Sequence, residues 1–346
     1  MSIFKTSAIA LAIFASVAAV PAHAAPVSSA VSVVSFENFR INWAGPTLNR
    51  QVDTSDFSSL SFNASQLTAA NMTGVTGSTM NPSSNNALPV KALSSVGSVP
   101  VTLNGAGGIG SITTTQAFQV PALPMAGNFS LSMSNDVGVP LTGFTNNSGP
   151  GGASVAVAPR GDLHNASYAS LDTLNGSAGT SSSSRVSSQQ RFTAGVGGNF
   201  LSFTFDIGTY VGAFLSAGAA QTASANWDIS FLLVNTNISA FDPPAAGRNV
   251  VNRTFSDSAS NNAPGSGVTV VGSANSLLNG SGLPIVNPFG FVSDFALIAG
   301  NVYEFTATIN TRVQVERQFV PEPGALALVG LALTALGLTR RREKRA

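Results

Sequence analysis

The chain of 346 residues contains no cysteine, and only 9% of its residues are charged. Without cysteine there can be no disulfide framework, no thiolate nucleophile and no thiolate zinc site. The charged fraction is far below the roughly 25% of typical soluble domains, and weak charge repulsion favours association between copies. Stability must therefore come from bound ions or from a packed core, which a chain of this length can bury.

Residues suited to catalysis are also scarce. The chain has two histidines, and His23 lies in a segment that we expect to be removed, which leaves His164 close to Asp162. A single histidine without cysteine cannot form a typical zinc site, and no serine lies in a Gly-x-Ser-x-Gly turn. Neighbours in sequence seldom orient each other as a catalytic triad requires. We therefore predict no catalytic residue, no metal site and no cofactor.

A glycine motif at residues 105–110 is also better explained without a ligand. Gly105, Gly107 and Gly110 have the spacing of a dinucleotide-binding loop. That loop needs a helix after the third glycine and an acidic residue roughly 20 positions later. Here the β-branched run 111–115 follows instead, and the next acidic residue is Asp136. The motif indicates a glycine-rich hairpin loop.

Acidic residues offer one remaining catalytic route. Asp206, Asp228 and Glu304 fall on the polar faces of predicted strands, so they form either a carboxylate pair for glycoside hydrolysis or isolated charges on a wet face. We favour isolated charges. Asp53 and Asp56 flank a turn and either bind Ca²⁺ through oxygen ligands or cap the loop, and we favour capping.

Aromatic residues could provide a platform on which sugars stack. Trp227 faces the core in the predicted strand 225–233. Trp43 and Tyr168 are then the candidates for sugar stacking.

The N-terminus has the three parts of a secretory signal peptide. Lys5 provides the positive charge, residues 8–20 are apolar, and Ala22 and Ala24 form a small-x-small cleavage site. We predict a signal peptide at residues 1–24, with cleavage between Ala24 and Ala25. Export then requires the secretory translocon and a signal peptidase.

The C-terminus also has three parts. Pro321, Glu322 and Pro323 precede an apolar run that predicts a hydrophobic helix over residues 324–339. A basic cluster follows, which the positive-inside rule would keep in the cytoplasm. It comprises Arg340, Arg341, Arg342, Lys344 and Arg345. The apolar run is shorter than the roughly 20 residues of a full membrane span.

This order of motif, helix and basic cluster resembles the PEP-CTERM sorting signal of exosortase-dependent bacterial surface proteins. The resemblance covers residues 320–346. It implies recognition of Pro321-Glu322-Pro323 by an exosortase-like membrane enzyme after transient insertion into the inner membrane, followed by removal of the tail. The protein would then be secreted or displayed in the exopolysaccharide-rich envelope of a Gram-negative bacterium. The alternative is an uncleaved tail anchor, which has no need of the Pro-Glu-Pro motif.

Removal of both signals reverses the sign of the net charge. The whole chain carries +1, whereas residues 25–319 contain 10 basic and 13 acidic residues, a net charge of −3. No basic patch survives in this exported body, so a nucleic-acid partner is not expected.

The exported body shows the alternation of half-buried β-strands. Apolar and polar residues alternate over residues 201–207, 225–233 and 303–315. Weaker strand candidates are residues 31–36, 39–43, 99–103, 109–120, 129–133 and 268–271. Turn-rich stretches separate them, which favours an all-β sandwich or jelly roll with long Gly/Ser/Asn-rich loops. The Ser/Gly-rich passage 143–190 is either a mobile insertion or a boundary between two β units.

Taken together, these features predict a non-enzymatic surface or matrix protein. It would contribute to an exopolysaccharide biofilm matrix through self-association, polysaccharide contact or both. The second hypothesis is a lectin-like carbohydrate-binding module, and the third is a secreted glycan-active enzyme that uses acidic residues.

Overall fold

The computed structural model describes residues 27–74, 79–81, 90–96, 125, 127–136, 163–172, 178–215, 221–239, 248–261, 268–269, 287–317 and 330–334. The predicted signal peptide with its cleavage site, the Pro-Glu-Pro motif and the basic cluster lie outside these residues. So do Asp162, the glycine motif at 105–110 and the strand candidates 99–103 and 109–120. Residues 330–334, inside the predicted hydrophobic helix, are helical. Among the described residues, no helix has the length and apolar character needed to cross a membrane.

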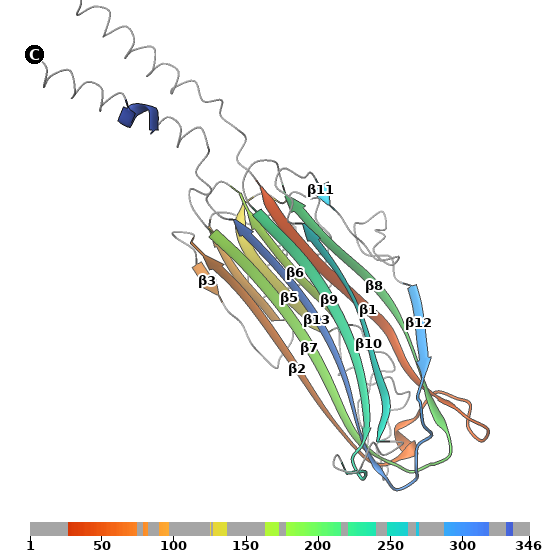
Figure 1. Ribbon diagram of the computed structural model, residues 1–346. Helices are drawn as coiled ribbons and strands as arrows, with labels where there is room; N and C mark the ends of the chain where they lie inside the picture. The colour runs from red at the N-terminus through yellow and green to blue at the C-terminus, as the bar shows by residue number, and fades with distance from the viewer. Residues whose placement is uncertain are drawn as a thin grey trace, which may run out of the picture.

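The described residues form two antiparallel sheets packed face to face, so the prediction of a β-sandwich is confirmed (Figure 1). Sheet A has the strand order β11-β8-β1-β6-β5-β4-β3, with β12 also paired to β8, and sheet B has the order β10-β9-β13-β7-β2. The strands are β1 (Ser28–Ala44), β2 (Phe57–Thr73), β3 (Thr79–Asn81), β4 (Val90–Val96), β5 (Asn128–Asp136), β6 (Leu163–Leu171), β7 (Ala178–Ala194), β8 (Phe200–Leu215), β9 (Gln221–Asn235), β10 (Asn249–Asn261), β11 (Val268–Thr269), β12 (Asn287–Val292) and β13 (Val302–Arg317).

The three segments with clear alternation lie in β8, β9 and β13, as predicted. β9 and β13 pair along their whole length at the centre of sheet B. A tight turn precedes β13. Gly300 adopts a φ of 81°, in the left-handed region that favours glycine, and its N–H donates to the Ala194 carbonyl at 2.7 Å.

Strand β1 joins two candidates that the sequence pattern separates. A β-bulge between Glu37 and Arg40 shifts its register against β8, and Asn38 adopts a φ of 56°. Because of this extra residue, Phe36 before the bulge and Phe39 after it both point into the core. Residues 31–36 and 39–43 are thus one bent strand.

Phenylalanines fill one half of the space between the sheets. The ring centroids of Phe36 and Phe205 are 4.9 Å apart, and Phe39 lies 6.0 Å from both Phe231 and Phe305. Phe36, Phe39, Phe231 and Phe305 are no more than 1% exposed. Each such aromatic pair adds roughly 0.5–1.5 kcal/mol beyond the burial of its surface. This half of the sandwich is a packed core of the kind that a chain without disulfides needs for stability.

The other half of the interface is polar. Strands β5 and β6 turn serine and asparagine side chains toward sheet B, where they donate to backbone carbonyls. Ser132 Oγ donates to Ala69 at 2.9 Å and Asn165 Nδ2 to Ile309 at 2.9 Å. In return, Ser182 Oγ on β7 lies 3.0 Å from the Leu131 carbonyl on β5. Such short side chains let the two sheets approach closely, and each bond satisfies a buried polar group.

The passage 143–190 is therefore neither a mobile insertion nor a boundary over its described part. Residues 163–171 form β6 inside sheet A, and residues 178–190 belong to β7, which pairs with β13 and β2 inside sheet B. The interpretation as a loop was wrong there. Serine is typical of turns, but here its short hydroxyl side chain suits the polar interface between the sheets.

A second apolar cluster covers the opposite face of sheet A. Its members, all 8% exposed or less, are Val31, Val33, Met125, Phe129, Leu131, Met133, Ala166, Tyr168 and Tyr210. Strands β5 and β6 thus present serine to the neighbouring sheet and apolar residues to the outer side. Sheet A is buried on both faces at this point.

Strand β1 begins and strand β13 ends at the same end of the sandwich. Ser28 begins β1, and its hydroxyl is hydrogen-bonded to Gln221 Oε1. Gln221 in turn lies opposite Arg317, the last residue of β13. The last residue of β13 therefore lies at the end of the sandwich at which β1 begins.

Candidate functional site: a polar groove on the outer face of sheet B

The outer face of sheet B, the side away from sheet A, is made largely of small polar residues. Alternate residues of β2, β7, β13 and β9 point outward, because their neighbours point into the core. On β7 the outward residues include Ser181, Ser183, Ser187 and Gln189, and none of these is fully buried. A face without an apolar stripe has no need of a covering layer, so it remains available for contact with a polar partner.

A groove of about 400 Å³ crosses this face near the end where β2 and β13 finish. Its side chains lie in two neighbouring lines that run across four strands. One line is Asn71, Ser181, Gln314 and Ser224, and the other is Ala69, Ser183, Arg312 and Asn226. We call these eight residues the polar groove. Four strands span about 14 Å, because neighbouring strands lie about 4.8 Å apart.

The depth of the polar groove follows from residue size. Serines on β7 form low positions between the longer side chains of Arg312 and Gln314 on β13 and Asn71 on β2, and Ser224 on β9 forms another low position on the other side of β13. The next line along the sheet contains Leu67 and Arg185, which are both exposed. Long side chains therefore border a floor of hydroxyl groups.

The chemistry of the polar groove is that of hydroxyl recognition. Serine hydroxyls donate and accept, the amides of Asn71, Asn226 and Gln314 do both, and Arg312 offers up to five donors with a fixed positive charge. Arg312 is exposed and takes part in neither of the two ion pairs found among the described residues. A ligand rich in hydroxyl, ether or carboxylate oxygens would match these donors and acceptors.

Sequence reasoning missed the polar groove for a physical reason. Residues 181–184 are four consecutive serines, which show no alternation and lie inside the Ser/Gly-rich passage 143–190. In the structure Ser182 and Ser184 face the other sheet while Ser181 and Ser183 face outward. The one available signal was the strong alternation of β13, which places Arg312 and Gln314 on a common polar face.

The three acidic residues considered for catalysis do not meet. Asp206 belongs to sheet A, where it accepts from Asn38 Nδ2 at 2.6 Å. Asp228 lies opposite Asn310 on sheet B, six residues along β13 from Glu304, which corresponds to about 20 Å. Glycosidases hold their two carboxyl groups roughly 5–9.5 Å apart. The hypothesis of a carboxylate pair on one sheet surface is therefore wrong, and each residue is an isolated charge.

Neither candidate for sugar stacking is accessible. Trp43 and Tyr168 are both 0% exposed, so the prediction that they form a stacking platform was wrong. Tyr168 belongs to the second apolar cluster, where burial raises the pKa of its phenol far above the usual range. Trp227, by contrast, faces the core as predicted and is 4% exposed.

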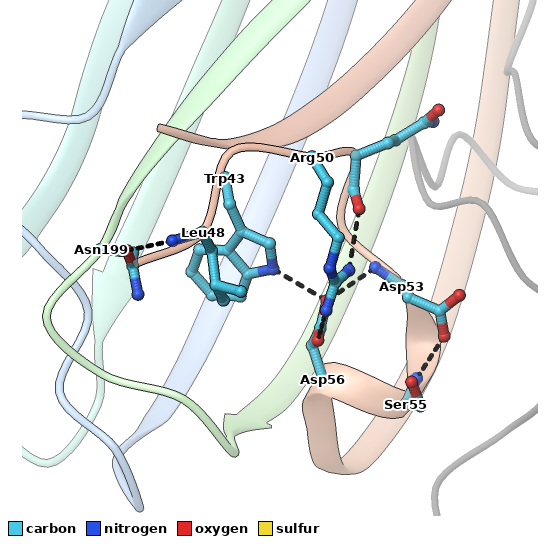
Figure 2. A network of polar contacts seen from close by, with 8 residues as sticks. Trp43, Leu48, Arg50, Asp53, Ser55, Asp56 and Asn199 are labelled. Atoms are coloured by element: carbon cyan, nitrogen blue, oxygen red, sulfur yellow. Dashed lines mark hydrogen bonds and ion pairs between the residues drawn. The ribbon is translucent and has the colours of Figure 1, made fainter. Parts of the chain in front are cut away.

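Trp43 instead anchors a polar network at the far end of the sandwich from Ser28 and Arg317 (Figure 2). Its indole N–H donates to Asp56 Oδ2 at 2.8 Å, and Arg50 Nη1 donates to the same oxygen at 2.8 Å. Arg50 Nη2 also bonds the other carboxylate oxygen, so the guanidinium engages Asp56 with both nitrogens. The Asp53 N–H donates to Asp56 Oδ2 at 2.8 Å.

This network decides between the two interpretations of Asp53 and Asp56. Asp53 is the N-cap of the short helix η1 (Thr54–Asp56), and its side chain and that of Asp56 form a capping box. Loop capping is thus confirmed. Burial raises the pKa of Asp56, but the hydrogen bonds from Arg50, Trp43 and Asp53 outweigh it and hold this pKa below its ordinary value. A carboxylate that already accepts four hydrogen bonds is a poor Ca²⁺ ligand.

The part of the chain that the structure describes contains no cluster of three or more His, Asp or Glu side chains placed to hold a metal ion. His164 lies on β6, and Asp162 falls just before the described part of that segment. No protein-family model matches this chain, and no curated protein matches it either.

Proposed function

We propose that the chain is an exported, non-enzymatic surface protein that contacts exopolysaccharide through the polar groove on sheet B. The observation that supports contact with polysaccharide is the polar groove itself, eight small or hydrogen-bonding side chains aligned across four strands. An extended, hydroxyl-rich chain fits such an open site better than a compact substrate. Arg312 would favour a polysaccharide that carries carboxylate groups.

The destination is proposed from the two ends of the sequence. A signal peptide at 1–24 and the tail at 320–346 support export followed by sorting through an exosortase-like enzyme. Mass spectrometry of the secreted protein tests this proposal. We expect a mature C-terminus close to Pro321-Glu322-Pro323, and a secreted chain that still contains Arg340–Arg345 would contradict it.

Binding of the producing cell's own polysaccharide tests the polar groove. We expect Arg312→Ala to weaken binding about tenfold or more, because a hydrogen bond from a charged donor contributes roughly 1.5–3 kcal/mol. Gln314→Ala should weaken it less. The affinity can be measured by isothermal titration calorimetry on the full chain.

The matched control is Arg191→Ala. Arg191 is an exposed arginine on the same face of sheet B, opposite Glu304 and away from the polar groove. This variant changes the net charge of the protein as Arg312→Ala does, so it should change the affinity less than twofold. Equal losses in the two variants would indicate non-specific charge attraction and would refute a role for the polar groove.

A second candidate function, self-association, is favoured by strand β2. Among the described strands β2 ends sheet B, and its 17 residues contain no charged residue and no proline. Proteins usually protect long edge strands with lysine, proline or bulges, because an unprotected edge can pair with another chain. The register shift of β2 lies at its first residues, between Phe57 and Ser59, and leaves residues 59–73 as a regular edge. The β2 edges of two copies would then pair and join the molecules.

Substitution of Leu67 tests this candidate. Leu67 is 54% exposed on β2, and Leu67→Lys should lower the apparent mass measured by analytical ultracentrifugation. Leu232→Lys is the control, since Leu232 is 38% exposed on the interior strand β9. A mass that changes in both variants, or in neither, would exclude pairing through β2.

A further inference from the structure

An apolar pocket of about 380 Å³ opens at the edge of the sandwich, between β8 and β12 of sheet A and β9 and β10 of sheet B. This edge pocket is lined by Phe205, Ile207, Trp227, Thr254, Phe255, Ser256 and Phe289. Its volume falls within the range of small-molecule sites, which are mostly apolar with a few polar groups. None of its residues belongs to the polar groove.

Aromatic rings form the walls of the edge pocket. The rings of Phe205 and Phe289 are nearly parallel, at an interplanar angle of 10° and a centroid separation of 6.0 Å. Phe255 meets both of them edge-on, at 69° and 68°. Phe255 and Phe289 are only half-buried, so part of their surface borders the pocket rather than another side chain. These walls fit a flat apolar molecule.

Two buried polar atoms beside these walls have no partner in the protein. Trp227 is 4% exposed, and its indole N–H donates to no acceptor. Asp257 is not itself a lining residue of the edge pocket, but it lies directly opposite Trp227 in the β9–β10 ladder, and its Oδ2 atom is buried without a donor. Buried polar atoms without a partner are uncommon in folded proteins. One unused donor and one unused acceptor therefore lie side by side.

We propose that the edge pocket binds a small, uncharged apolar molecule that carries one hydroxyl group. A hydroxyl oxygen accepts a hydrogen bond from the Trp227 indole while its proton is donated to the Asp257 carboxylate. The apolar skeleton of the ligand packs between Phe205, Phe255 and Phe289. This site is separate from the polar groove, so its role does not depend on polysaccharide binding.

The probe is 2-naphthol, a flat aromatic alcohol, and the matched probe without the hydroxyl is 2-methylnaphthalene. Binding to the purified full chain in detergent-free buffer is followed by the fluorescence anisotropy of each probe. We expect one saturable site for both probes and an affinity at least threefold higher for 2-naphthol, because one or two hydrogen bonds are added. Absence of saturable binding would overturn the proposal.

Two variants test the aromatic walls and the Trp227–Asp257 polar pair independently of each other. Trp227→Phe removes the donor and replaces the indole by a smaller aromatic ring, so it should abolish most of the preference for 2-naphthol over 2-methylnaphthalene, whatever the affinity that both probes lose with the smaller ring. Phe289→Ala removes a wall and should weaken both probes at least fivefold. Circular dichroism checks that each variant is folded, and the near-ultraviolet signal of Trp43 remains available in Trp227→Phe.

The control variant is Leu232→Ala, on the same strand as Trp227 but exposed on the outer face of sheet B. It should change neither affinity. A loss in this variant would mean that the probes bind a surface patch, and an unchanged preference for 2-naphthol in Trp227→Phe would mean that the indole plays no part. Either result would refute the assignment.

Discussion

Asp56→Ala should be among the most destabilising single substitutions at the end of the sandwich that lies far from Ser28 and Arg317. The side chain of Asp56 is 5% exposed, and it accepts hydrogen bonds from Trp43, Arg50 and the Asp53 backbone. Its removal leaves the indole N–H of Trp43 buried without an acceptor, which costs roughly 1–3 kcal/mol. The loss of the hydrogen bond from the Asp53 N–H, which is the N3 half of the capping box, adds roughly 0.5–1.5 kcal/mol.

The loss of the Arg50 pair contributes less, because the Arg50 side chain is 45% exposed and can return to water. The first two contributions sum to roughly 1.5–4.5 kcal/mol, so we expect a loss of about 3 kcal/mol in the free energy of unfolding. Asp56→Asn keeps the volume and one acceptor oxygen, so we expect about half that loss.

Urea denaturation followed by circular dichroism measures these differences as shifts of the midpoint at constant slope. The matched control is Asp294→Ala. Asp294 forms the other ion pair of the described residues with Arg253, but both side chains are well exposed, at 41% and 38%. Its removal should cost less than about 1 kcal/mol.

A double-mutant cycle with Trp43→Phe isolates the indole bond. If that bond carries part of the effect, Asp56→Ala will cost about 1–2 kcal/mol less when Trp43 is already phenylalanine. A coupling energy near zero, or equal losses for Asp56→Ala and Asp294→Ala, would refute the argument that burial makes the Asp56 network strong.

Three further results are expected. Hydrogen bonds hold the pKa of Asp56 below its ordinary value, so the stability that Asp56 confers is complete above about pH 4 and is lost as the pH falls through the lower folded-state pKa. Asp56→Asn should therefore reduce the fall of the free energy of unfolding below about pH 4. Burial raises the pKa of all three tyrosines, so tyrosinate absorbance in an alkaline titration should appear only together with loss of circular dichroism, and earlier ionisation would contradict their burial. Ser182→Val should lower the free energy of unfolding by about 1–3 kcal/mol in urea denaturation, since it removes an inter-sheet hydrogen bond and crowds the narrow interface. Ser65→Val, on the exposed side of β2, should change it by less than about 0.5 kcal/mol.

How much the sequence predicts depends on what each strand buries. Where a strand has one apolar and one polar face, as in residues 303–315, the alternation alone placed it correctly and showed which face is wet. Residues 178–190 could not be recognised in this way, because serine occupies both faces of β7 and the inward serines are satisfied by carbonyls of strands distant in sequence. Hydrogen bonds to distant strands produce no periodic pattern in the amino-acid sequence.

The candidate site was harder to predict than the fold. Trp43 looked available for a sugar because nothing in the neighbouring residues indicates burial, and the Asp56 network that encloses it depends on a turn whose geometry the sequence does not specify. The polar groove depends on strand register, which brings residues 71, 181, 224 and 314 into one line. Register is set by tertiary pairing, so its consequences for a surface cannot be deduced from one strand.

The central position of β13 has a mechanical consequence. All 16 of its residues pair with β7 and all but Val302 also pair with β9, and the chain continues from its last residue, Arg317, toward the C-terminal tail. A tension applied between that tail and a polymer held on the outer face would act along the strand axis. The hydrogen bonds on both sides of β13 would then resist in shear and share the force, instead of opening one after another from the end. Such a sandwich would yield under load only when many bonds fail at once.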